Sequence, residues 1–122
     1  MYNKRILITG ASKGLGAVAA QTFAERGARI VLISRSQDKL EAVRLSCKNP
    51  ERHLSIPVDF LEMKQVQPAV LRAKDFLGGI DVVLHAAGGG LGLKDDFLSH
   101  GDFLKLFALN LGAVAEINRL VV

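Results

Sequence analysis

The chain has 122 residues, 49% of them hydrophobic and 23% charged, a composition that excludes an intrinsically disordered protein. Its net charge of +4 is uneven: residues 1–56 hold ten Lys and Arg against four Asp and Glu, and residues 57–122 hold six against eight. One cysteine and three scattered histidines exclude an internal disulfide and predict no metal site. No apolar run reaches the ~20 residues that cross a bilayer, and no signal-peptide cleavage site is present, so we expect a cytoplasmic protein without membrane partners.

The first elements are a buried strand and a helix. Residues 5–9 form a continuous apolar run that ends in glycine, typical of a strand covered on both faces. The spacing then predicts a helix over residues 14–26, with Gly27 as its left-handed stop. The residues expected on its buried face are Leu15, Val18, Ala19, Thr22 and Phe23.

The second pair repeats this pattern. Residues 29–34 read as a buried strand, and a helix opens at Ser36 or Gln37, with Leu40, Val43 and Cys47 inward. Residues 54–58 are a third strand, placed at a sheet edge because Pro57 cannot donate to a ladder.

The remaining pattern predicts a helix over residues 61–77, with a kink or a late start at Pro68. A fourth strand follows over 80–88, then a loop over 88–100 and an apolar helix over 102–122. Strict alternation of strand and helix indicates one α/β domain over residues 1–122, with a parallel, doubly wound sheet of the Rossmann type.

The first strand leads into the sequence TGASKGLG, residues 9–16. Gly10, Gly14 and Gly16 lie where strand becomes helix, and glycines there let the backbone approach a ligand. The helix start directs free N–H groups and a positive dipole toward the same place. This context favours a dinucleotide pyrophosphate site over a loop that is merely flexible.

The turn TGASKGLG closely resembles the TGxxxGxG cofactor turn of the short-chain dehydrogenase/reductase family. The resemblance extends to VDF at 58–60, LHAAG at 84–88 and ALNLGAV at 108–114, although His85 and Ala86 replace the family's usual asparagines. It implies hydride transfer between a nicotinamide cofactor and a carbonyl or alcohol, for example in a 3-oxoacyl-carrier-protein reductase. The cofactor-binding residues that it implies are Gly10, Ser12, Lys13, Gly14, Leu15, Gly16, Ser34, Arg35, Asp59, Phe60, Ala87 and Gly88.

The end of the second strand bears on the choice of cofactor. NAD-binding enzymes place a carboxylate ~20 residues beyond the glycines, but this chain has Ser34 followed by Arg35. A guanidinium binds a phosphate well, and Lys13 and Ser12 lie in the glycine turn. We therefore expect NADP, the alternative being that Arg35 and Lys13 are solvated charges.

Two further residues have a structural alternative. The resemblance gives Asp59 a contact with adenine, but Asp59 would also serve as N-cap of the helix that starts near Leu61. It makes Asn110 a catalytic residue that kinks its helix and holds a water of the proton relay. Asn110 would otherwise be an ordinary exposed helix position.

The family's catalytic Tyr-x-x-x-Lys is absent, since the only tyrosine is Tyr2 and Ile6 lies four residues later. We therefore expect the amino-terminal part of a longer enzyme, inactive alone, whose sheet is incomplete on its carboxyl-terminal side. Self-association through the last helix is also expected. The alternatives are a non-catalytic NADP(H)-binding or sensor module and, less favoured because aromatic residues are few, a basic nucleic-acid-binding domain.

Overall fold

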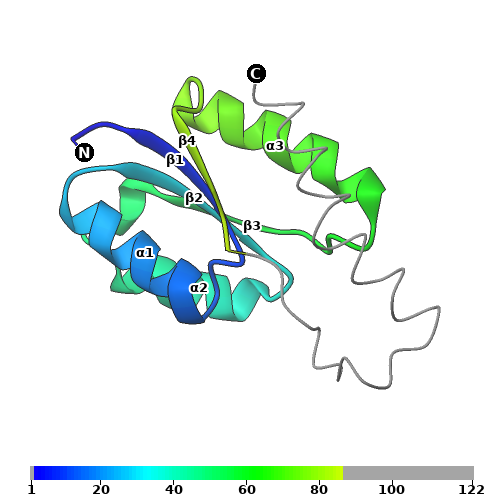
Figure 1. Cartoon of the computed structure of the whole chain (residues 1–122), viewed down its shortest axis with the longest axis horizontal. Coiled ribbons are helices and arrows are strands. Elements are labelled where there is room, and N and C mark those ends of the chain that lie inside the picture. The colour runs from blue at the N-terminus through cyan, green and yellow to red at the C-terminus, as the bar shows by residue number, and fades with distance from the viewer. Residues whose placement is uncertain (1, 87–122) are drawn as a thin grey trace.

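The computed structural model describes residues 2–86, in which strands and helices alternate as the sequence predicts (Figure 1). The elements are β1 (Arg5–Thr9), α1 (Gly14–Glu25), β2 (Arg29–Ser34), α2 (Gln37–Ser46), the 3-10 turn η1 (Pro50–Arg52), β3 (Leu54–Pro57), α3 (Met63–Leu77) and β4 (Val82–His85). The predicted loop 88–100 and helix 102–122 lie outside the described residues, as do Ala87, Gly88 and Asn110.

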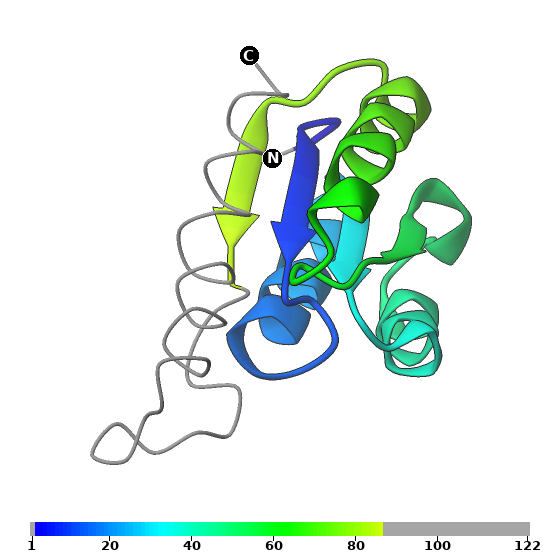
Figure 2. The ribbon, with the colours of Figure 1, turned by 90° about the vertical axis from the view of Figure 1, so that its right-hand side faces the viewer.

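The four strands form one parallel sheet in the order β3-β2-β1-β4. Thr9 at the end of β1 pairs with Ile33 of β2 and with His85 of β4, so the carboxyl ends of the strands lie at one edge. Figure 2 shows the arrowheads of β1 and β4 pointing the same way, toward the turn into α1. The position of β3 confirms that the strand with Pro57 is an edge strand of the described sheet.

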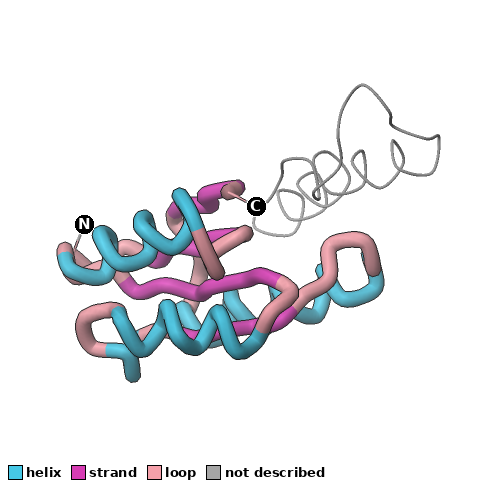
Figure 3. Tube along the Cα trace, turned by 90° about the horizontal axis from the view of Figure 1, so that it is seen from below, coloured by secondary structure: helices cyan, strands magenta, loops and turns pink. Residues whose placement is uncertain are grey.

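Helices cover both faces of the sheet, which confirms the doubly wound arrangement. On one face Ile6, Ile8 and Ile30 pack with residues of α1 and α2. On the other face Leu7 and Val31 pack with residues of α3. The alternate side chains of β1 and β2 thus enter two separate cores, which is why the interior residues of both strands are all apolar. The alternation of strands and helices along the chain can be followed in Figure 3.

None of the helices within residues 2–86 has the length and apolar character needed to span a bilayer.

The buried face predicted for α1 is largely wrong. Leu15 is 72% exposed and Val18 58% exposed, and Thr22 is also exposed. The helix instead buries small residues, Gly16, Ala19, Ala20 and Ala24. A Cβ atom on Gly16 would lie only 2.2 Å from the Gly10 carbonyl oxygen, so α1 approaches β1 too closely for large side chains to fit between them.

Helix α3 begins at Met63, two residues later than predicted, and Pro68 lies within it. Pro68 is in the second turn, where its ring removes one hydrogen bond of the helix ladder. Its buried residues include Val66, Val70 and Ala73, which recur at helical spacing along one face. The helix ends at Gly78, whose φ of +78° is the left-handed conformation common after a helix.

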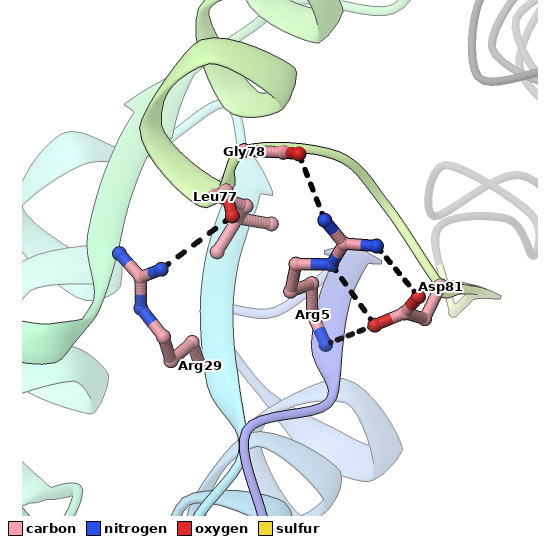
Figure 4. A network of polar contacts seen from close by, with 5 residues as sticks. All are labelled: Arg5, Arg29, Leu77, Gly78 and Asp81. Atoms are coloured by element: carbon pink, nitrogen blue, oxygen red, sulfur yellow. Dashed lines mark hydrogen bonds and ion pairs between the residues drawn. The ribbon is translucent and has the colours of Figure 1, made fainter.

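Two arginines, at the amino ends of β1 and β2, donate hydrogen bonds to carbonyl groups at the carboxyl-terminal end of α3 (Figure 4). Arg29 donates to the carbonyl oxygens of Phe76 (3.1 Å) and Leu77 (3.4 Å). Arg5 donates to the Gly78 carbonyl at 2.8 Å and pairs with the Asp81 carboxylate at 2.9 Å. The Arg5 guanidinium holds the pKa of Asp81 well below its usual range. This end of the sheet is therefore occupied by contacts within the fold.

Candidate functional site

The carboxyl edge of the sheet keeps the segments after the strands side by side. Ala11 N donates to Ile33 O at 3.2 Å, which ties the glycine turn to β2. Val58 N donates to Ser34 O at 2.8 Å, and Ala86 N to Thr9 O at 3.1 Å. These bonds continue the parallel pairing past the strand ends. They align the starts of three connecting segments along the edge where open α/β sheets bind ligands.

The three glycines of the turn meet two requirements, positive φ and close packing. Gly10 and Gly14 have φ of +68° and +58°, which L side chains rarely adopt. Gly16 permits the close approach of α1 described above. A Cβ on Gly14 would meet no atom of the described fold within 4 Å. Gly14 is therefore a glycine beside open space, as expected where a ligand approaches the backbone.

No side chain among residues 2–86 caps the amino-terminal end of α1. Its N-cap residue, Lys13, is extended and makes no capping hydrogen bond, and the first turn holds no acidic residue. Helix α2 differs, since Ser36 Oγ accepts from Lys39 N at 3.3 Å and Asp38 lies in its first turn. The first N–H groups of a helix have no acceptor within it. At α1 they remain for an anionic group, which the positive end of the dipole also favours.

Basic side chains flank this helix start. Lys13 and Arg35 are both exposed, and neither makes a side-chain hydrogen bond or ion pair with residues 2–86. Ser34 is only 7% exposed, and its Oγ accepts a long hydrogen bond from Ser36 N at 3.4 Å. Ser34 therefore helps to fix the backbone on both sides of Arg35. Ser12, in the glycine turn, is half-buried.

The segment after β3 places Asp59 at the same edge, since the preceding residue, Val58, donates its N–H to Ser34 O at the end of β2. Asp59 is not the N-cap of α3, as the structural alternative had it: its Oδ1 accepts from Leu61 N at 3.0 Å, and Glu62 is the N-cap. The helix simply starts too late for Asp59 to reach its first turn. The Phe60 side chain is 5% exposed and lies in the core beneath α3. Only its backbone is therefore available to a ligand.

Sequence reasoning missed Gln65, whose Oε1 accepts from Asp59 N at 2.9 Å. Gln65 is the third residue of α3, a position from which Gln often reaches back to backbone before a helix. This preference could have identified Gln65 from the sequence. It did not, because a helix that starts at Leu61 does not have Gln65 as its third residue.

The ten predicted site residues that the structure describes lie in these connecting segments or at the adjoining ends of α1 and β2, where Gly14, Leu15, Gly16 and Ser34 are found. Leu15 is exposed at the start of α1, beside Gly14. Within residues 2–86, no group of three or more His, Cys, Asp and Glu side chains could hold a metal ion. Around the glycine turn, the described edge offers backbone amides and cations, which suit an anionic ligand.

Comparisons with known proteins agree with this fold. The family model described as short chain dehydrogenase matches residues 4–122. A ketoacyl reductase, HetN, from Nostoc sp. is 33% identical over 99% of this chain. A glucose 1-dehydrogenase from Gluconobacter oxydans is 34% identical over 91% of it. The crystal structure of 3-ketoacyl-(acyl-carrier-protein) reductase from Brucella melitensis, complexed with NADH, superimposes on 99% of the chain with a TM-score of 0.87 and 25% identity.

The chain matches only part of each of these proteins. It covers 42% of the ketoacyl reductase, 42% of the glucose dehydrogenase and 50% of the Brucella chain.

Proposed function

Because the chain belongs to the short-chain dehydrogenase family, we propose that residues 1–122 form the dinucleotide-binding domain of an NADP(H)-dependent oxidoreductase. The cofactor would supply the hydride that is exchanged with a carbonyl or alcohol substrate. The chain's own residues bind and orient that cofactor. The relatives are named for a ketoacyl group and for glucose, so we keep the substrate class broad; an acyl-carrier ketone is one candidate.

The observation that carries this proposal is the geometry of the glycine turn. Gly14 leaves open space beside a helix start that no side chain of the described part of the chain caps, and Gly16 lets that helix lie against the strand. A bound pyrophosphate would accept hydrogen bonds from the first N–H groups of α1. The backbone is already in the required conformation, with positive φ at Gly10 and Gly14, so binding needs little ordering of the turn.

The choice of NADP rests on Arg35 and Lys13. A 2′-phosphate would find two cations at this edge and no carboxylate at position 34. The Brucella structure contains NADH, but its chain is 25% identical and its cofactor does not decide the preference here. An arginine whose charge has no partner among the described residues favours the phosphorylated cofactor.

The remaining roles are proposals that extend to the rest of the chain. Asp59 and the backbone of Phe60 would contact adenine, and Ala87 and Gly88 would allow approach to the ribose. Asn110 would act in turnover of the complete enzyme, so its substitution should spare cofactor binding. We also propose a cytoplasmic protein that self-associates through residues 102–122.

Fluorescence titration with NADPH and NADH tests the proposal. Arg35→Asp should weaken NADPH binding by about 10- to 100-fold, the contribution of a hydrogen bond to a charged group, and should favour NADH. Arg26→Asp is the matched control, because Arg26 is an exposed arginine at the opposite end of α1. Unchanged NADPH affinity in Arg35→Asp would refute the phosphate contact.

The same titration tests the alternatives. A wild-type chain that gives no saturable signal with either dinucleotide is not a dinucleotide-binding domain. A nucleic-acid-binding domain would keep its retention on heparin when NADPH is added. We expect NADPH to release the chain.

A further inference from the structure

We propose that Gln65 is a positioning residue for the adenine end of the cofactor, and that it acts by fixing the backbone of Asp59. This inference rests on the proposed dinucleotide site. The geometry of the glycine turn and of the basic side chains is not part of the argument for this role of Gln65. It arises from the way α3 begins.

The turn between β3 and α3 is closed by four hydrogen bonds. Asp59 N donates to Gln65 Oε1 at 2.9 Å, and Leu61 N donates to Asp59 Oδ1 at 3.0 Å. Glu62 N donates to Asp59 O at 2.9 Å, and Gln65 N donates to Glu62 O at 2.9 Å. Three of the four involve Asp59, so its N–H, its C=O and one carboxylate oxygen are all engaged.

Of these four hydrogen bonds, only the one to the Gln65 side chain joins the helix to the strand end. The other three bonds lie within the turn and would move with it. Val58 is fixed on the other side, because its N–H donates to Ser34 O at 2.8 Å and its side chain is buried. Gln65 therefore anchors the peptide between Val58 and Asp59 to the first turn of α3.

The hydrogen bond from Asp59 N to Gln65 Oε1 determines where the second carboxylate oxygen of Asp59, Oδ2, lies. Within residues 2–86, Asp59 Oδ2 accepts no hydrogen bond, and the side chain is half-buried. A carboxylate oxygen is an acceptor only. It suits the 6-amino group of adenine and repels the 6-oxo group of hypoxanthine. Asp59 would thus select the base, and Gln65 would hold Asp59 in the position to do so.

The test is the ratio of two dissociation constants, one for NADPH and one for its hypoxanthine analogue. In the wild-type chain we expect tighter binding of NADPH. Gln65→Met, which keeps the size of the side chain but removes the acceptor, should shrink this preference by about threefold to tenfold, the range for one lost hydrogen bond. Gln65→Glu keeps an acceptor and should retain the preference.

Gln67→Met is the matched control, since Gln67 is an exposed glutamine of the same helix without a hydrogen bond to the described residues. If Gln65 only stabilises the helix start, Gln65→Met will lower the melting temperature or weaken both ligands equally. The ratio will then stay at the wild-type value, which would overturn the inference. If Gln65→Met fails to fold, Gln65→Asn, whose side chain is one methylene shorter, provides the same comparison.

The two proposals fail in different ways. A wild-type chain that binds neither dinucleotide removes the proposed function. A wild-type chain that binds NADPH and the hypoxanthine analogue equally keeps the proposed function but overturns the inference, because Asp59 then makes no selective contact with the base.

Discussion

Gly14 allows backbone strain to be separated from ligand contact at the level of one residue. Gly14 and Gly78 both have positive φ, +58° and +78°, and a Cβ on either meets no atom of the described fold within 4 Å. Alanine at each position should therefore lower the free energy of unfolding by about 1–2 kcal/mol. Only Gly14→Ala should also weaken NADPH binding, by at least about tenfold, because its methyl group would lie where the pyrophosphate approaches.

Urea unfolding and NADPH titration of both variants measure the two effects. Gly78 lies beyond the end of α3, at the opposite end of the sheet from the glycine turn, so Gly78→Ala controls for the strain. NADPH affinity unchanged in Gly14→Ala would show that no ligand approaches this residue.

His53 makes the stability of the fold dependent on pH. It is 4% exposed; its Nδ1 accepts from Ile30 N at 3.2 Å, and its Nε2 lies 2.9 Å from Lys48 O. Both contacts are satisfied by the neutral ring with the proton on Nε2. Burial lowers the pKa of His53 below its ordinary 6.5, with Arg52 and Arg44 acting in the same direction and the Lys48 carbonyl and Glu51 opposing them.

The unfolded chain therefore binds a proton at His53 at a higher pH than the folded chain does. The stability that depends on the neutral ring is fully present above about pH 6.5 and is lost as the pH falls toward the folded-state pKa. We expect the free energy of unfolding in urea to decrease from pH 7.5 to pH 5. The decrease should be smaller in His53→Gln, and an identical slope in that variant would assign the effect to other groups.

Among the elements, α3 depends on a side chain from another part of the fold. The Arg29 guanidinium donates to Phe76 O and lies over the Phe76 ring at 5.4 Å. Its charge also complements the negative end of the helix dipole. Arg29→Met should lower the free energy of unfolding by about 1–2 kcal/mol. Arg72→Met, which removes an exposed arginine of α3, should change it by less than about 0.5 kcal/mol.

Cofactor affinity provides a second measurement for this pair of variants. The Arg29 contacts are at the amino ends of the strands (Figure 4), whereas the glycine turn follows Thr9 at the carboxyl end of β1. NADPH binding should therefore be unchanged in Arg29→Met. A loss of stability as small as that of Arg72→Met would mean that solvent satisfies these carbonyl groups equally well.

The elements also show what the sequence does and does not determine. Apolar runs predicted β1 and β2 to the residue, since both faces of these strands are buried. The same logic misplaced the buried face of α1, because periodicity ranks residues by hydrophobicity whereas a close helix–strand approach selects them by size. Leu15 is exposed and Ala20 is buried for that reason.

The site also has features that the sequence predicts and features that it does not. The positions of the glycines and of Arg35 could be predicted because they depend on local backbone and on the order of the strands. The bond from Gln65 to Asp59 could not, since it depends on where α3 begins, to within two residues. Likewise the sequence did not reveal that the Phe60 side chain packs in the core beneath α3, which leaves only the Phe60 backbone for the predicted contact with the cofactor.

At the scale of the whole molecule, charge is distributed unevenly. Residues 1–56 contain six more basic than acidic residues, and residues 57–122 contain two more acidic than basic ones, from the counts of ten against four and six against eight. Lys13 and Arg35 belong to the basic part and lie at the edge that would bind the cofactor. The field of the basic part should add to the local contacts in attracting an anionic ligand.

Salt therefore offers a test of how the cofactor is distinguished. NADPH differs from NADH by a phosphate that would lie beside exposed cations, and the screening length falls from about 10 Å at 0.1 M salt to about 3 Å at 1 M. The preference for NADPH over NADH should decrease several-fold over this range. The preference for adenine over hypoxanthine should change little, because both bases are neutral. Arg35→Asp should remove most of the salt dependence. A wild-type NADPH preference that is constant from 0.1 M to 1 M salt would show that charge at this edge does not select the cofactor.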